Sequence, residues 1–133
     1  MLTPWLEAFP RTASAVVDEI DSTLGYRLSS VIEEGPSRSL TATRNAQPAI
    51  MATSVLILRV LGEEFGFRPF EADSGGRRRV DVALGHSLGE FSALVAAGVL
   101  RFPDALRICA RRAEAMAEAT RRAREAHAAD YAA

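Results

Sequence analysis

The segment Gly85-His86-Ser87-Leu88-Gly89 has the residue types and spacing of a serine nucleophile on a sharp turn. In a G-x-S-x-G motif the serine lies between a strand and a helix, in a strained backbone conformation that exposes its hydroxyl. Glycines two positions to either side lack a Cβ atom, which allows the strand and the helix to approach closely. The N–H of Leu88, at the start of the helix, is placed to bind a developing oxyanion. The alternative is a serine with a purely structural role in the turn.

Neither histidine of the chain is well placed to act as the general base for Ser87. His86 is adjacent to the serine on a tight turn, where neighbouring side chains point to different sides, so we expect a packing or hydrogen-bonding role beside the site. His127 belongs to an alanine-rich helix end, where a surface histidine is expected. The sequence therefore predicts a nucleophile without its base.

A second candidate, Arg112, lies on an otherwise small and apolar face of the C-terminal helix. Ala105, Cys109, Arg112 and Met116 follow the i, i+4, i+7, i+11 spacing of a single helix face. Such an arginine can reach solvent past its aliphatic stem or pair with an internal carboxylate; it can also hold a substrate carboxylate through two parallel hydrogen bonds. The spacing alone does not favour either interpretation.

Three elements must position these residues. Residues 80–84 (VDVAL) are typical of a short buried parallel strand directly before the turn, and helical spacing resumes after Gly89. A last helix begins at Pro103 and contains good helix formers without a breaker. Upstream, residues 45–67 predict a helix with Pro48 in its first turn. This helix is apolar on nearly all sides, so we expect it to be buried within something larger.

The remaining segments predict further helices and one loop. Residues 5–24 have the spacing of a surface helix with Gly25 as its C-cap, and residues 28–32 form a shorter helical piece. Residues 67–79 contain two adjacent glycines and a run of three arginines. We interpret this segment as a solvated loop in preference to an anion-binding patch.

The composition excludes several classes of function. The 133 residues are 48% apolar and 25% charged, with a net charge of −1, as in one ordinary soluble domain or part of one. The near-neutral net charge gives no extended positive potential that would attract nucleic acid or an anionic bilayer. No apolar run is long enough to span a membrane. One cysteine and two histidines argue against a disulfide or a metal site. We read the first ten residues as domain interior and not as a targeting segment.

The segment GHSLGEFSALVAAGVL, preceded by AQPAIMATSVLILRVL and followed by ARRAEAMAEA, resembles the malonyl-CoA:acyl-carrier-protein transacylase family, and most of all its fungal mitochondrial branch. The resemblance runs from about residue 41 to residue 119, interrupted by the loop at 67–79. It implies that Ser87 is the nucleophile, that Leu88 supplies an oxyanion amide and that Arg112 holds the malonyl carboxylate. Gln47, in the AQPA box, would lie near the active site, although an ordinary position near the start of a helix is the alternative.

The resemblance also implies a fold and a reaction. The fold is α/β, an α/β hydrolase-like acyltransferase core in which helices flank a parallel sheet, with residues 1–133 as one part of the domain. The family's first strand and Gly/Gln-rich oxyanion loop, its catalytic histidine, an active-site asparagine and a ferredoxin-like subdomain have no counterpart here. The tail HAADYAA would approach the first strand of that subdomain.

In the implied reaction, malonyl-CoA acylates Ser87 and the phosphopantetheine thiol of acyl carrier protein then takes the malonyl group. No metal or bound organic cofactor is involved, the pathway is fatty-acid synthesis, and the compartment is the mitochondrial matrix. Because the base and half of the oxyanion hole have no counterpart in the sequence, we expect little or no transferase activity from the isolated chain. We also expect it to fold only marginally.

Two other functions fit part of the pattern. An α/β-hydrolase such as a thioesterase or lipase also carries a GHSLG turn, but Glu90 after the turn and a cation at Arg112 are not typical of simple hydrolysis. A non-catalytic fragment that binds carrier protein or another partner is the third possibility.

Overall fold

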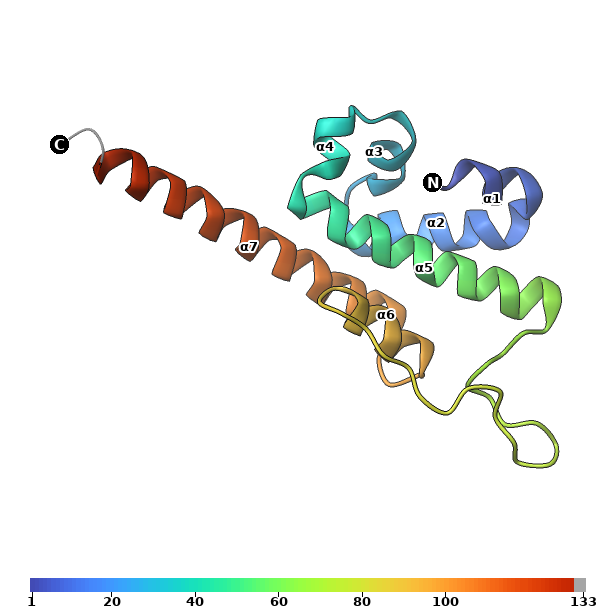
Figure 1. Cartoon of the computed structure of the whole chain (residues 1–133). Coiled ribbons are helices and arrows are strands. Elements are labelled where there is room, and N and C mark those ends of the chain that lie inside the picture. The colour runs from blue at the N-terminus through green and yellow to red at the C-terminus, as the bar shows by residue number, and fades with distance from the viewer. Residues whose placement is uncertain (131–133) are drawn as a thin grey trace.

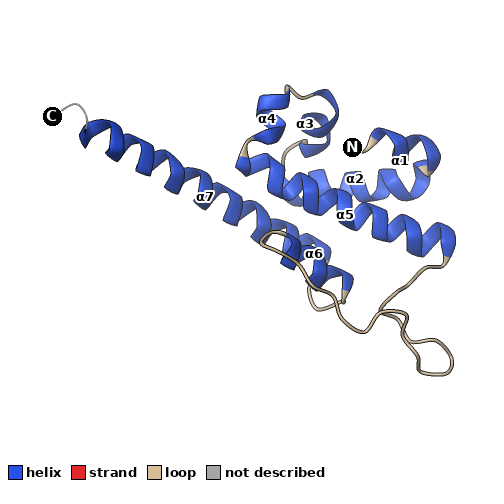
Figure 2. Ribbon diagram, viewed as in Figure 1, coloured by secondary structure: helices blue, strands red, loops and turns tan. Residues whose placement is uncertain are grey.

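The computed structural model describes residues 1–130, and this part of the chain is entirely helices, turns and loops (Figures 1 and 2). The helices are α1 (Thr3–Ala8), α2 (Pro10–Leu24), α3 (Leu28–Glu34), α4 (Ser37–Thr41), α5 (Thr43–Phe65), α6 (Gly89–Ala96) and α7 (Phe102–Asp130). One long loop, residues 66–88, connects α5 to α6 and extends below the helices in Figure 1. None of the described helices combines the length and the apolar character that crossing a membrane requires.

The core lies between α2, α5 and α7. Helix α5 packs most extensively against α7, and α2 contacts both of them. The fully buried residues of the three helices form one apolar cluster, whose largest members include Ile20, Met51, Leu56 and Leu106. Burying such side chains stabilises a fold by about 1.5–3 kcal/mol each relative to leaving them exposed. This cluster fixes α5 beside α7, and these two helices carry two of the candidate site residues.

Several helix boundaries agree with the sequence and two do not. Helix α2 ends at Gly25 in the left-handed conformation, with φ +73°, and α3 ends before Gly35. The N-terminal helix is not continuous, because the chain breaks at Phe9 between α1 and α2. Helix α5 begins at Thr43, which places Pro48 inside the helix and not in its first turn.

Helix α5 is also less enclosed than its composition predicts. One face is buried in the core, but Ile50 on another face is 48% exposed. Burial of α5 on nearly all sides, which we expect within something larger, is therefore not seen among the described residues. Apolar residues around most of its circumference leave part of the helix surface without a partner here.

Residues 80–84 do not form the predicted strand. A strand is stable only when its N–H and C=O groups pair with a neighbouring strand, and the described residues provide none. The side chains that a sheet would cover are open, with Val82 66% and Leu84 90% exposed. The N–H of Val80 instead donates to the carbonyl of Pro69 at 2.9 Å, which closes the base of the loop. The predicted parallel sheet is thus not present in residues 1–130.

The C-terminal half of α7 extends away from the other helices (Figure 1). Ion pairs along its surface, Arg121 with Glu118 and Glu125 and Arg122 with Glu118, have the three- and four-residue spacings that stabilise exposed helices. The first four residues of the tail HAADYAA end this helix, and the last three lie outside the described residues.

Candidate active site

The turn before α6 has the backbone geometry of a nucleophile elbow. Ser87 has φ +56°, and it is the one non-glycine residue with a positive φ in the described chain. The N–H of Gly89 donates to the carbonyl of His86 at 2.9 Å, and that of Glu90 donates to the carbonyl of Ser87 at 3.3 Å. A left-handed conformation is unfavourable for a residue with a side chain, and such strain is characteristic of functional turns.

The two glycines of the motif have different roles. A Cβ atom at Gly85 would lie 2.1 Å from the backbone carbonyl group of Gly89 and 2.3 Å from the nitrogen of Glu90, so any larger residue would force the turn open. A Cβ atom at Gly89 would meet nothing within 4 Å. The expectation that both glycines are needed for close approach is confirmed at Gly85, whereas no described atom lies close enough to Gly89 to require its missing Cβ.

The backbone amide of Leu88 is free to bind a ligand. Among the described residues its N–H donates to no acceptor, whereas the next three amides are all bonded within the turn. Leu88 directly precedes α6, whose N-terminal end carries a partial positive charge. The amide is therefore available to an anionic oxygen formed beside Ser87.

Arg112 connects the turn to the helical core. Its Nη2 donates a hydrogen bond of 2.7 Å to Ser87 Oγ, and its Nη1 donates to Gln47 Oε1. The structure thus brings together three predicted site residues that are 25 and 65 positions apart in the sequence. Each comes from a different element: Gln47 from α5, Ser87 from the turn, and Arg112 from α7.

The environment of Arg112 bears on the two interpretations of its spacing. Among residues 1–128, whose side chains the structure describes, no carboxylate forms an ion pair with it. Its guanidinium has five N–H donors, of which the two bonds above use two. A half-buried cation with spare donors and no internal counter-ion is suited to an anionic ligand, which favours the carboxylate clamp.

Gln47 is buried, with 7% of its surface exposed, and its amide is bonded at both ends. The oxygen accepts from Arg112, and Nε2 donates to Met116 Sδ at 3.4 Å. The contact with Met116 was not predicted from the sequence. The available signal was the four-residue spacing of Arg112 and Met116, which places both on one face of α7.

Neither histidine contacts the Ser87 hydroxyl, but the packing or hydrogen-bonding role expected for the His86 side chain is not seen in the described residues. His86 is exposed, and the Ser87 hydroxyl is bonded to Arg112 and not to this imidazole. His127 follows Arg112 by fifteen positions in the same helix, which corresponds to about 22 Å along its axis. Residues 1–130 therefore place no imidazole against the nucleophile, in agreement with the sequence.

Cys109 is not a competing nucleophile. It is fully buried between α7 and the core, and this burial raises the pKa of its thiol, an effect that the charge of Arg112 only partly opposes. A buried thiol with a raised pKa is unreactive. No group of three or more potential metal ligands occurs among the described residues.

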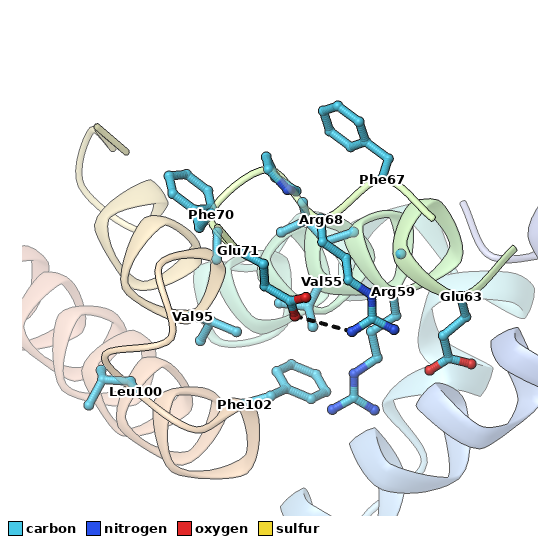
Figure 3. A pocket seen from close by; sticks show the side chains of 14 residues that line it. Val55, Arg59, Glu63, Phe67, Arg68, Phe70, Glu71, Val95, Leu100 and Phe102 are labelled. Carbon is cyan, nitrogen blue, oxygen red and sulfur yellow. Dashed lines mark hydrogen bonds and ion pairs between the residues drawn. The ribbon is translucent and has the colours of Figure 1, made fainter. Parts of the chain in front are cut away.

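A cavity of about 360 Å³ lies beside the second half of α5 (Figure 3), and Ser87 is not among the residues that line it. Its two guanidinium groups are both paired, Arg59 with Glu19 and Arg68 with Glu71, the latter contact drawn as a dashed line in the figure. Arg59 follows Gln47 by twelve positions on α5, or about 18 Å. The cavity is therefore separate from the candidate site and offers no unpaired cation to a ligand.

Comparison with known proteins identifies the family to which this chain belongs. The family model described as "Acyl transferase domain" matches residues 6–132, and the chain belongs to this family. Among curated proteins, the chain is similar to the malonyl CoA-acyl carrier protein transacylase of Bacillus subtilis, with 46% identity over 107 residues that cover 80% of this chain and 30% of that protein. The Escherichia coli K12 transacylase is 39% identical over 101 residues, covering 76% and 29% of the two chains.

Solved structures give the same result. The acyl-carrier-protein S-malonyltransferase of Bartonella henselae superposes with a TM-score of 0.74 at 40% identity, over 87% of this chain and 34% of that one. A malonyl-transacylase solved in complex with its type II polyketide synthase acyl-carrier protein gives a TM-score of 0.71 at 39% identity, over 90% and 35%. The chain therefore has the fold of the corresponding part of these enzymes, and it spans about a third of their length.

Proposed function

We propose that the chain carries the nucleophile and the carboxylate-binding group of a malonyltransferase that moves a malonyl unit from malonyl-CoA to acyl carrier protein. The observation that carries this proposal is the hydrogen bond of 2.7 Å from Arg112 Nη2 to Ser87 Oγ. It places an arginine without a carboxylate partner directly against the nucleophile. The names of the relatives, which are malonyl transacylases, support the same choice of substrate.

The proposed reaction has two steps. Ser87 Oγ attacks the thioester carbonyl of malonyl-CoA while a base takes its proton, and CoA leaves as the thiol. The Leu88 amide and the N-terminal end of α6 stabilise the oxyanion of the tetrahedral intermediate. The phosphopantetheine thiol of acyl carrier protein then attacks the malonyl ester and releases Ser87.

Arg112 accounts for the preference for a malonyl group. Once malonyl is esterified to Ser87, its free carboxylate is only one methylene beyond the ester carbonyl. A guanidinium that already contacts Oγ can bind this carboxylate with its remaining donors, and such charge-assisted pairs are stronger than neutral hydrogen bonds. An acetyl group has no free carboxylate to pair with the same guanidinium.

Several features of the active enzyme are not seen in the described residues, and we propose them by resemblance. The chain is part of an α/β acyltransferase domain in which residues 80–84 join a parallel sheet. The general base and the second oxyanion amide approach Ser87 from its exposed side, and a ferredoxin-like subdomain follows. The enzyme uses no bound cofactor. The superposition with a transacylase solved together with its carrier protein supports the proposed partner.

Fatty-acid synthesis in the mitochondrial matrix is the proposed setting. The curated relatives described above are bacterial, so the compartment stays a prediction that rests on the resemblance to the fungal mitochondrial branch. Imaging a fluorescent fusion of the protein expressed from its intact gene, against a matrix marker, would test it. Diffuse cytoplasmic fluorescence would contradict the proposed location.

A chimera tests whether this chain supplies what we propose. Residues 6–132, the range matched by the family model, would replace the corresponding part of the Bacillus subtilis relative. Incubation with malonyl-CoA should add one malonyl group to Ser87, detectable by mass spectrometry, and acyl carrier protein should remove it. Ser87→Ala is the control. Malonyl transfer that survives this substitution would overturn the assignment, and ester hydrolysis without transfer would favour a hydrolase.

A further inference from the structure

Met116 on α7 lies at the outer end of a series of contacts that leads to the nucleophile. Its Sδ is 3.4 Å from Gln47 Nε2, which donates to it. Gln47 Oε1 accepts from Arg112 Nη1, and Arg112 Nη2 donates to Ser87 Oγ at 2.7 Å. Met116 is thus coupled to Ser87 through Gln47 and Arg112, although it does not contact the serine itself.

The donors and acceptors along this series fix the orientation of the Gln47 amide. A guanidinium can only donate, so only the oxygen of the amide can face Arg112. The NH2 group must then face the other neighbour, and a thioether can only accept. Because only 7% of the Gln47 surface is exposed, water cannot readily replace either hydrogen-bond partner of its amide.

We propose that Met116 is a positioning residue that sets which acyl groups the site accepts. By accepting the hydrogen bond from Nε2, its sulfur holds the Gln47 oxygen toward Arg112. The anchored guanidinium then keeps Nη2 at Ser87, where it can bind a carboxylate on the acyl group. This inference rests on the proposed malonyl transfer.

Loss of the sulfur acceptor should act selectively. Without this acceptor, no hydrogen bond at residue 116 holds Nε2 in place, and the Gln47 amide can rotate by half a turn. In that reversed orientation its NH2 group would face the N–H groups of Arg112. The guanidinium would then lose an acceptor and adopt more orientations. Binding of an acyl group with a free carboxylate should weaken, and transfer of an acyl group without one should not change.

Met116→Leu tests this prediction because it removes the acceptor at nearly constant volume. In the chimera, we expect KM for malonyl-CoA to rise about threefold to fivefold, as for the loss of one modest hydrogen bond, with kcat and acetyl transfer nearly unchanged. Met116→Gln, which restores an oxygen acceptor, should recover the original KM. Met51→Leu is the matched control, since Met51 is a fully buried core methionine whose sulfur accepts no hydrogen bond from the described residues. An equal rise in KM in both leucine variants would overturn the proposal.

A double variant separates positioning from packing. In a Gln47→Leu background there is no amide to orient, so Met116→Leu should cause no further change in the malonyl KM. If the effects of the two substitutions on the malonyl KM instead multiply, Met116 acts independently of Gln47 and the proposal is wrong.

A readout that does not depend on activity uses the side-chain amide signals of Gln47 in NMR spectra of the 133-residue chain and of the chimera. Met116→Leu should shift these signals, and Met51→Leu should leave them in place. Unchanged signals in Met116→Leu would overturn the positioning role. Shifted signals in a protein that transfers no malonyl group would support the positioning role and would count against the proposed function alone.

Discussion

At the scale of single residues, Ser87 combines a reactive position with a strained backbone. Its φ of +56° is one that residues other than glycine rarely adopt, and holding it there costs about 1–3 kcal/mol. The hydroxyl is bonded to Arg112, so removing the side chain has two opposite effects on stability. The strain and the hydrogen bond can be separated by choosing two replacements for the same residue.

Ser87→Gly should be more stable than Ser87→Ala by about 1 kcal/mol, because both lose the hydroxyl but only glycine relieves the strain. Urea denaturation of the two variants, followed by circular dichroism, measures this difference. Equal stability would show that Ser87 does not have a left-handed backbone in solution.

The Cys109 thiol provides a second test at this scale. Burial raises its pKa, so at a given pH the folded chain contains less thiolate than the unfolded chain, and the thiolate is the reactive form. We expect alkylation by iodoacetamide at about pH 8, near the ordinary thiol pKa, to be much slower in the folded chain than in denaturant. Since the folded pKa is the higher one, stability should fall as the pH rises past the unfolded thiol pKa. Equal alkylation rates would contradict the packing of α7 on the core.

At the scale of elements, the sequence predicts the local features of the site better than the long-range ones. The turn, the start of α6 and the start of α7 follow from Gly85, Gly89 and Pro103, because such signals act within a few residues. Residues 80–84, predicted as a strand, form none within the described residues, because strand formation depends on partner strands elsewhere. For the same reason, spacing alone could not show that Arg112 reaches Ser87, although the family resemblance placed both at one site.

The two glycines of the elbow give a matched pair of substitutions. Gly85→Ala would place a Cβ atom 2.1 Å from backbone atoms of Gly89, so the turn must shift and Ser87 with it. We expect acylation of the chimera to fall about a hundredfold, the effect of displacing a reacting group by roughly 1 Å. Gly89→Ala meets no atom within 4 Å and should retain most of the activity. Equal losses in both variants would contradict this description of the turn.

At the scale of the whole molecule, the helical core is well formed but the surface beside the turn is open. Val82 is 66% exposed, Leu84 90% and Leu94 37%. Exposed apolar side chains that lie close together promote association. The long loop therefore carries both the strained turn at Ser87 and Leu84, the most exposed large apolar side chain among the described residues.

We expect the purified 133-residue chain to melt over a broad temperature range and to self-associate as its concentration rises. Sedimentation velocity and thermal melts by circular dichroism measure both properties. Leu84→Ser should reduce association without loss of helix, because this side chain is almost fully exposed and contributes little to the core. A sharp melt from a monomeric chain would contradict the expectation of marginal folding.

The most direct test of the account is the ratio of malonyl to acetyl transfer by the chimera before and after Arg112→Ala. If Arg112 binds the malonyl carboxylate beside Ser87, malonyl transfer should fall about a hundredfold, the loss expected for two hydrogen bonds between charged groups. Acetyl transfer should change far less, so the preference for malonyl should largely disappear. An unchanged ratio would show that the arginine at Ser87 does not select the acyl group, and the central claim would be wrong.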